Sequence, residues 1–213
     1  METEGISRKE REYLAHREEI LSAAEKVFAA KGFFPTTMSD IARKAEFGTG
    51  TLYKYFKSKE ELYFTLIDEK VEEVNRLVNA ELSQKTSGVE KIRKVLGLQF
   101  EFIERNRDFF RIYISERSRF EWTIKDDLGK GIHDKMITYI NALAEVMRQG
   151  IKEGEFKPMN PLDLAHALVG MVNSFVFEWL ISQQHYPLVS KLDTVLEIFL
   201  GGVQRKGKEE IDR

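Results

Sequence analysis

The sequence predicts an all-α protein, and three observations support that fold class. Only four prolines interrupt 213 residues. Long stretches are rich in Glu, Lys, Leu and Ala, which are strong helix formers. Apolar residues recur at spacings of three and four, as they do along one face of an α-helix. The chain is long enough to bury a substantial core, in one large domain or two small ones.

The N-terminal quarter of the chain predicts three helices and the start of a fourth. The first begins near Ser7 or Arg17 and ends at Lys31, directly before a glycine. The second is "MSDIARKA", and the third is "TLYKYF", which follows the tight turn "EFGTG". The fourth runs over residues 59–82. Three capping boxes mark helix starts: Ser7–Glu10, Thr37–Asp40 and Ser58–Glu61.

Beyond a polar break at residues 83–88 the apolar pattern predicts five more helices. Asn160 and Pro161 open one of them, as a cap and a first-turn proline. The stretch "HYPLV" is expected to be a break between the last two. The five expected helices span residues 89–106, 107–116, 132–153, 161–184 and 192–204.

Two short helices joined by a tight turn, with a longer helix before them, form the helix-turn-helix pattern. Its expected core is Ile41, Ala42, Ala45, Phe47, Leu52 and Phe56. Residues 43–59 hold five basic side chains and one acidic side chain, on a chain with a net charge of −2. This local basic patch favours a nucleic-acid surface. A solvated helix face is the alternative interpretation.

Composition narrows the other classes of function. There is no cysteine, which excludes disulfides and thiolate metal sites and fits a cytoplasmic location. No apolar run reaches the length of a membrane span, and the charged start does not resemble a signal peptide. Asp163 with His166, and His133 with Asp134, are interpreted as surface pairs rather than metal ligands. "GTGT" lacks the lysine ending of a phosphate loop. We expect no enzyme activity, metal or cofactor.

The run "GFFPTTMSDIARKAEFGTGTLYKYFKSKEEL", Gly32 to Leu62, resembles the DNA-binding domain of the TetR family of bacterial transcriptional repressors. The shared pattern is a glycine–aromatic pair, two Thr or Ser residues, "xxIAxxA", a turn and "GTLYxYFxxKEEL". The resemblance implies a DNA-binding domain over residues 1–58 and a helical ligand-binding and dimerisation domain over 59–213. Helix 59–82 would connect the two.

The resemblance also implies a set of DNA contacts. Residues placed to meet phosphates are Thr37, Tyr53, Tyr55, Lys57 and Lys59. Residues placed for base edges in the major groove are Thr49, Gly50, Thr51 and Lys54, with Lys44 on the same exposed surface. Many family members carry Ser-Lys where this chain has Gly48 and Thr49. This departure weakens the cap of the third helix, unless Thr49 caps it one residue later, and leaves the operator sequence open.

TetR proteins are homodimers, usually joined through their last two helices. The residues expected in that interface are Leu168, Val172, Trp179, Val195, Ile198, Phe199 and Gly202. Two-fold symmetry would place two recognition helices about 34–36 Å apart, one DNA turn, and predicts a near-palindromic operator.

The middle helices carry many aromatic side chains, either as plain core or as the wall of an apolar pocket. The candidate pocket residues are Phe100, Ile103, Arg107, Phe110, Arg111, Tyr113, Phe120, Trp122, Met136, Tyr139, Leu143, Met171 and Phe175. The C-terminal run also resembles the fatty-acid-degradation regulators of the family, which sense long-chain acyl-CoA. That resemblance implies a repressor that a hydrophobic effector releases from DNA by moving helix 59–82. Drugs, bile-acid-like molecules and other lipids stay open as effectors. The alternative function is a helical lipid or acyl carrier that does not bind DNA.

Overall fold

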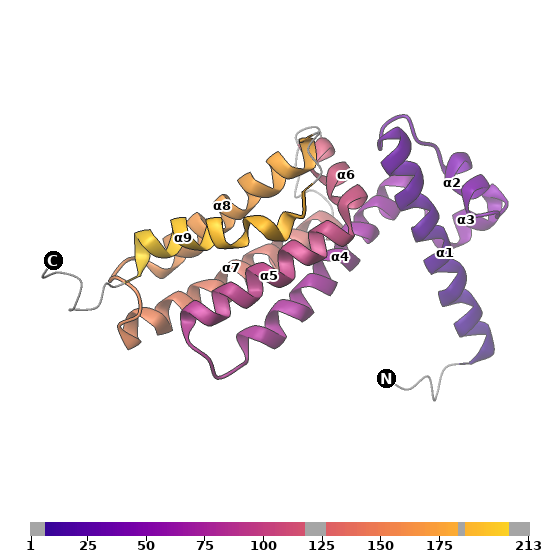
Figure 1. Cartoon of the computed structure of the whole chain (residues 1–213). Helices are drawn as coiled ribbons and strands as arrows, with labels where there is room; N and C mark the ends of the chain where they lie inside the picture. The colour runs from indigo at the N-terminus through magenta and orange to yellow at the C-terminus, as the bar shows by residue number, and fades with distance from the viewer. Residues whose placement is uncertain (1–6, 118–126, 183–185, 205–213) are drawn as a thin grey trace, which may run out of the picture. The chain divides into compact units, whose positions relative to one another are not determined.

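The computed structural model describes residues 7–117, 127–182 and 186–204. Those residues form helices throughout, with one isolated bridge between Phe156 and Gln204, which confirms the predicted all-α class (Figure 1). In chain order the elements are α1 (Arg8–Lys31), α2 (Met38–Lys44), α3 (Thr49–Tyr55), α4 (Lys59–Leu82), α5 (Gly88–Arg105), α6 (Arg107–Arg117), α7 (Asp127–Glu153), α8 (Pro161–Ile181), the 3₁₀ helix η1 (Leu188–Lys191) and α9 (Leu192–Val203).

Most helix boundaries lie where the local caps predict them. The Ser7 side chain accepts from the Glu10 N–H, and Asn160 caps α8 through the N–H groups of Leu162 and Asp163. The prediction was wrong by more than one residue in four places. Helix α3 begins at Thr49 instead of Thr51, and α8 ends at Ile181 instead of residue 184. Helix α7 begins five residues before the expected position 132, and the expected break before α9 contains η1. Neither start carries a side-chain signal as clear as a capping box.

The chain forms two compact units, and each is described by itself. One holds the residues up to Glu69 together with Asp108–Lys130, and the other holds Lys70–Arg107 and the residues from Gly131 onward. Helix α4 therefore contributes to both units. Helix α6 belongs to the first unit, where the Arg111 guanidinium donates a hydrogen bond of 3.0 Å to the Ala29 carbonyl of α1.

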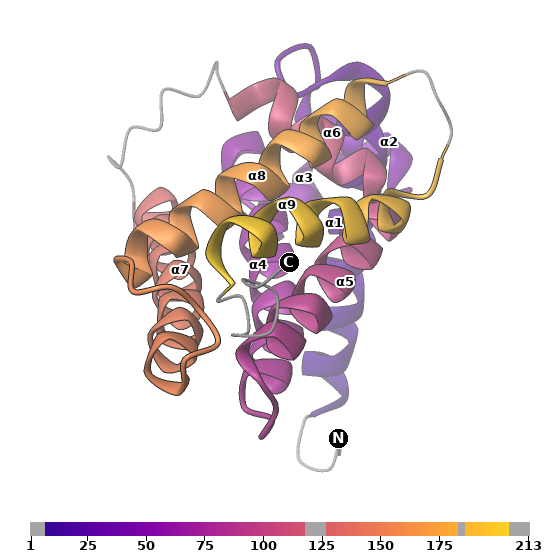
Figure 2. The same ribbon diagram turned by 60° about the vertical axis from the view of Figure 1, so that its left-hand side comes forward.

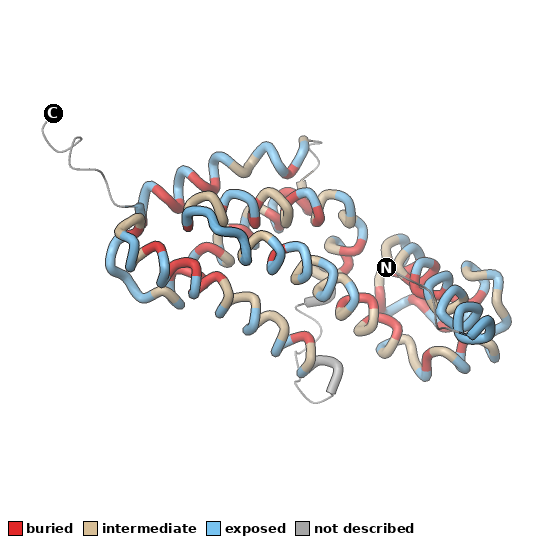
Figure 3. The backbone as a smooth tube through the Cα atoms, turned by 90° about the horizontal axis from the view of Figure 1, so that it is seen from below, coloured by how far each residue is buried: buried red, intermediate tan, exposed pale blue. Residues whose placement is uncertain are grey.

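The first unit has a small core that holds α1, α2 and α3 together. Side chains that are almost fully buried come from each helix and from the start of α4 (Figure 3): Ile20, Ala24, Phe28, Ile41, Ala42, Leu52, Phe56, Leu62 and Ile67. Four of the six expected core residues are buried, whereas Ala45 and Phe47 are half-buried. Burial of Leu52 fixes which side of α3 faces outward.

The second unit packs α5, α7, α8 and α9 with the C-terminal part of α4. Helices α4, α5, α7 and α8 share an apolar cluster: Val78, Val95, Leu143, Ala144 and Ala165. Helices α8 and α9 lie side by side in both views (Figures 1 and 2). By length and composition alone, α8 passes the test for a membrane-spanning helix, as core helices of globular proteins also do. Seven of its side chains are buried within the chain.

Candidate nucleic-acid interface

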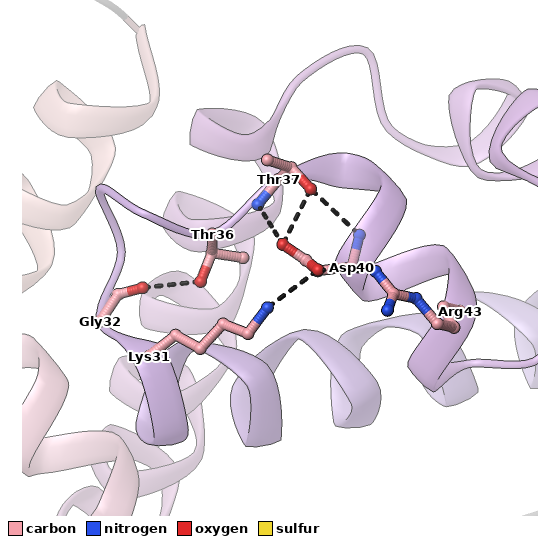
Figure 4. Close-up of polar contacts among 6 residues, drawn as sticks. All are labelled: Lys31, Gly32, Thr36, Thr37, Asp40 and Arg43. Atoms are coloured by element: carbon pink, nitrogen blue, oxygen red, sulfur yellow. Dashed lines mark hydrogen bonds and ion pairs between the residues drawn. The ribbon is translucent and has the colours of Figure 1, made fainter.

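Helix α2 begins at a complete capping box. The Thr37 hydroxyl oxygen accepts from the Asp40 N–H at 3.1 Å, and the Thr37 N–H donates to the Asp40 carboxylate at 3.2 Å (Figure 4). Lys31 and Arg43 each place a nitrogen 2.9 Å from the other carboxylate oxygen. Hydrogen bonds from Lys31 and then Thr37 lower the pKa of Asp40 from 3.8 to about 2. This carboxylate ties the end of α1 to the start of α2.

The turn between α2 and α3 uses a residue in the left-handed region. Glu46 has a φ of 61°, which is uncommon for a residue other than glycine. The Phe47 N–H then returns to the Ala42 carbonyl at 2.9 Å. Gly48 is the N-cap of α3 and supplies no side-chain hydrogen bond, as the departure from the Ser-Lys pattern predicts. Thr49 lies inside the helix and does not take over that role.

The outward side of α3 carries most of the predicted base-contacting residues. Thr49, Gly50 and Lys54 are exposed, and Thr51 is half-buried. The Tyr53 side chain is 52 % exposed. A Cβ atom at Gly50 would meet no atom within 4 Å, so the backbone is open to a close approach. Thr49 with Tyr53, and Gly50 with Lys54, are spaced four apart and therefore share a face of the helix.

Two predicted phosphate contacts have partners inside the chain. The Tyr55 hydroxyl lies 3.1 Å from His16 Nδ1, and its ring stacks on Tyr13 with 4.7 Å between centroids. The Lys59 ammonium donates to the carbonyls of Phe33 at 2.9 Å and Phe34 at 3.0 Å. These contacts position α3 and α4. Sequence reasoning missed His16 and Tyr13 because nothing local links α1 to a residue 39 positions away.

The other predicted DNA contacts, Thr37, Lys44 and Lys57, have exposed side chains. The Lys57 N–H donates to the Glu61 carboxylate at 2.6 Å, which helps to start α4. Together with the exposed face of α3, these side chains are the parts of the first unit that a DNA backbone can reach. Their contacts with DNA stay predictions.

The candidate pocket residues lie in different environments. Phe100 and Leu143 are buried; Ile103, Arg107, Phe110, Tyr113, Met136, Tyr139, Met171 and Phe175 are half-buried. Phe120 and Trp122 lie outside the described residues. Two arginines that were expected to meet an anion already have partners. Arg107 lies 4.6 Å from the centroid of the Trp179 ring, and Arg111 binds the Ala29 carbonyl.

Two open surface grooves, of about 520 Å³ and 430 Å³, are lined by described residues of the second unit. Both lie where the end of α4, the following turn and α7 meet, and both include Ser83, Lys91 and Gln149. Neither groove is lined by a candidate pocket residue. At the nearby start of α5, the Val89 N–H already has a partner, because it donates to the Glu155 carboxylate at 3.2 Å.

Most residues predicted for a dimer interface are buried within the single chain: Leu168, Val172, Trp179, Val195 and Phe199. Ile198 and Gly202 are exposed. Three apolar side chains that the sequence analysis did not single out are exposed on α8: Leu162, Phe177 and Ile181. Gly170, Gly201 and Gly202 have open space where a Cβ would be. Apolar residues lie on every side of α8, so apolar spacing in the sequence does not separate these exposed positions from the buried ones.

Comparisons with known families and structures agree with this architecture. The family described as "Bacterial regulatory proteins, tetR family" matches residues 20–66, and the "YsiA-like protein, C-terminal region" family matches residues 67–202. The chain belongs to the TetR family. It is therefore a DNA-binding transcriptional regulator with a helix-turn-helix domain and a helical C-terminal domain. In the described part of this TetR protein no three His, Asp or Glu side chains are grouped as a metal site requires.

Individual TetR relatives are similar over most of their length. The fatty acid metabolism regulator protein of Bacillus subtilis (strain 168) is 27 % identical over 189 residues, which are 88 % of this chain and 95 % of that protein. The crystal structure of FadR from Bacillus subtilis in complex with stearoyl-CoA is 26 % identical, with a TM-score of 0.72 over 87 % of this chain and 98 % of that one. KstR2 of Mycobacterium tuberculosis, a ketosteroid regulator, is 25 % identical, with a TM-score of 0.74 over 89 % and 95 %. These relatives are named as regulators.

Proposed function

We propose that this TetR protein is a homodimeric repressor that binds a near-palindromic operator and leaves it when a hydrophobic effector binds. Residues 1–58 carry the DNA contacts, and residues 59–213 carry the effector site and the dimer interface. The observation that carries the proposal is the outward face of α3. Thr49, Gly50, Tyr53 and Lys54 lie there on a helix whose other side is fixed by the buried Leu52.

Each side chain on this surface has a chemically suitable partner in DNA. Lys54 and Thr49 donate hydrogen bonds to base edges, and Gly50 lets the backbone approach the floor of the major groove. The Tyr53 hydroxyl and the ammonium groups of Lys44 and Lys57 meet phosphates, which fixes the register without reading the sequence. Tyr55 and Lys59 act mainly as positioning residues, because His16 and the carbonyls at the end of α1 hold them.

The exposed apolar stripe on α8 and α9 supports the homodimer. Phe177 is 49 % exposed, Ile181 63 % and Ile198 54 %. Gly170 of α8 and Gly201 and Gly202 of α9 allow close approach of a second helix pair, because a Cβ there would meet no atom of the described chain within 4 Å. Several large apolar side chains exposed on two neighbouring helices are typical of a surface that another protein covers.

The proposed effector is the CoA thioester of a long-chain fatty acid. Relatives at 26–27 % identity that cover most of the chain support this class, since one is named a fatty acid metabolism regulator and another binds stearoyl-CoA. An effector releases DNA only if it binds the DNA-incompetent shape more tightly than the competent one. Helix α4 passes from one compact unit into the other and is the element through which binding would act.

Fluorescence anisotropy with DNA from upstream of the protein's own gene, with and without stearoyl-CoA, tests the proposal. We expect saturable binding that weakens with salt and is reversed by stearoyl-CoA. Lys54→Ala should weaken binding and Tyr53→Phe should weaken it alike on every sequence. Lys152→Ala, an exposed lysine at the end of α7, is the matched control.

Three results would contradict parts of the proposal. Binding that stearoyl-CoA does not affect would overturn the effector. Unchanged affinity of both α3 variants across salt concentrations would overturn the contact assignment. If neither the upstream DNA nor a selection from random DNA gave a bound sequence, the carrier function would replace the repressor.

A further inference from the structure

A polar pair lies inside the second unit, between α5 and α7. Gln99 of α5 donates from Nε2 to the Tyr139 hydroxyl of α7 at 2.6 Å. The Tyr139 ring packs against the apolar cluster that includes Val78, Val95 and Leu143. The two polar groups therefore meet among apolar side chains that offer them no hydrogen bonds.

One atom of this pair has no partner. Gln99 Oε1 is sealed from solvent and accepts no hydrogen bond from the described residues, and it is the single buried side-chain oxygen or nitrogen in that part of the chain for which this holds. Buried polar groups are nearly always hydrogen-bonded, because an unpaired one is destabilising. The amide oxygen and nitrogen are assigned from the network. Exchanging them would leave the nitrogen unpaired instead.

The free donor and acceptor of the pair define which chemical group could hydrogen-bond to both. Gln99 Oε1 accepts a hydrogen bond, and the Tyr139 oxygen, which already accepts from Nε2, still has its own proton to donate. Burial raises the pKa of Tyr139, so the hydroxyl stays a neutral donor near neutral pH. A group that both donates and accepts fits such a pair. Hydroxyl and secondary amide groups do so.

The position of the pair matches that of an effector site. Gln99 lies one helical turn from Ile103, and Tyr139 lies one turn from Met136 and from Leu143, all candidate pocket residues. As whole residues Gln99 and Tyr139 are only half-buried. A ligand therefore has a short path to them, although the Gln99 oxygen itself is sealed.

We propose that Gln99 and Tyr139 are the polar recognition point of the effector site, and that the effector presents a hydroxyl or amide group to them within an otherwise apolar environment. This inference rests on the proposed function and deepens it. The group has two possible sources: a hydroxyl on the fatty chain, or an amide of the pantetheine arm that every CoA thioester carries. A plain alkyl segment at this depth would leave Gln99 Oε1 unpaired.

The test compares the wild type with the Gln99→Leu/Tyr139→Phe double variant and with Gln84→Leu, a control at an exposed glutamine. Calorimetry measures binding of stearoyl-CoA, a mid-chain hydroxystearoyl-CoA and dodecanol. The double variant should unfold at a temperature at least as high as the wild type, because apolar replacement of both partners removes the unpaired group. Its affinity for a ligand that uses the pair should fall about tenfold.

The ligands separate the two sources. A hydroxyl on the chain predicts that the hydroxylated ester and dodecanol lose affinity and stearoyl-CoA does not. A pantetheine amide predicts that both CoA esters lose affinity equally and dodecanol does not. Equal affinity of the wild type and the double variant for every ligand would overturn the inference while the proposed effector stands. Gln99 Oε1 would then accept its hydrogen bond from a buried water.

The remaining outcomes separate this inference from the proposed function. Binding of dodecanol alone, lost in the double variant, would keep the polar site and overturn the CoA thioester as effector. Binding of none of the three ligands to the wild type would overturn both. A double variant that unfolds well below the wild type would show that the pair is a structural contact, which also contradicts the inference.

Discussion

The two compact units place their polar and apolar groups in opposite ways. Among the described residues of the first unit, Thr36 is a buried polar residue, 2 % exposed, and donates to the Gly32 carbonyl at 2.6 Å, and the outward face of α3 is mostly polar. The second unit buries a Gln99 oxygen that has no hydrogen-bond partner among the described residues, and it exposes apolar side chains such as Phe177 and Ile181. A surface that binds a charged polymer is rich in charged residues and can be recognised in a sequence. A site that binds an apolar partner is made of apolar residues, which a sequence does not distinguish from core residues.

The strongest test of this contrast places a charge on the exposed apolar stripe. Phe177→Lys should separate the proposed dimer, because each copy would bury an unpaired ammonium at a penalty of about 3 kcal/mol or more. Operator affinity should then fall more than about 100-fold. Sedimentation velocity and anisotropy measure the two effects. Ile137→Lys, at a 44 % exposed isoleucine of α7, is the control. A Phe177→Lys protein that stays dimeric would remove this stripe from the interface.

Glycines give a second test, within the second unit. A Cβ at Gly150 would overlap the ring of Phe156, which is 1 % exposed. Gly150→Ala should therefore lower the free energy of unfolding by about 2–3 kcal/mol. Gly131→Ala has open space in the same helix and should raise it by about 0.5–1 kcal/mol. Urea unfolding measures both. Equal effects of the two substitutions would mean that the Phe156 ring moves aside freely.

Lys59 tests whether a lysine predicted to contact phosphate serves DNA binding or the stability of the first unit. Lys59→Ala should cost about 1–2 kcal/mol of stability, since the ammonium binds two carbonyls and lies 4.3 Å from the centroid of the Phe33 ring. Lys57→Ala, two positions earlier with an exposed side chain, should leave stability nearly unchanged and weaken DNA binding. Thermal unfolding measures the stability of both variants, and fluorescence anisotropy measures their DNA affinity. If Lys59→Ala left stability unchanged and weakened DNA binding, Lys59 would be a direct phosphate contact and not a positioning residue.

The same residues show how far sequence could predict this molecule. Capping boxes and apolar spacing are local, so the bounds of α4 and the start of α8 could be predicted to the residue. Partners distant in sequence could not be predicted. Nothing near Tyr55 indicates that His16 holds its hydroxyl, and nothing near Lys59 points to the carbonyls before α2. On α8, apolar residues surround the whole helix, so periodicity alone does not distinguish the buried Leu168 from the exposed Phe177.

Acid pH tests the polar network of the first unit. The folded-state pKa of Asp40 is about 2, against 3.8 for the unaffected carboxyl. Because it is lowered, the charged form stabilises the fold fully above pH 4, and this contribution is lost as the pH falls towards 2. The thermal midpoint of the wild type should drop across that window more than that of Asp40→Asn. Asp163→Asn, an exposed carboxylate on α8, should keep the wild-type drop. Parallel curves for all three proteins would contradict a role for Asp40.

The smallest expected effect concerns the start of the recognition helix. Gly48 has extended backbone angles, with a φ of −67° and a ψ of 142°, and a Cβ there would meet only Thr51 Oγ1 at 3.9 Å. A serine fits this position and would cap α3, so Gly48→Ser should raise the free energy of unfolding by about 0.3 kcal/mol. Gly48→Ala, which adds the Cβ without the oxygen, should lower it by about 0.5 kcal/mol. Chemical unfolding of the three proteins separates the contributions. If alanine stabilised as much as serine, the gain would come from a stiffer unfolded chain, and α3 would need no side-chain cap to present its outward face.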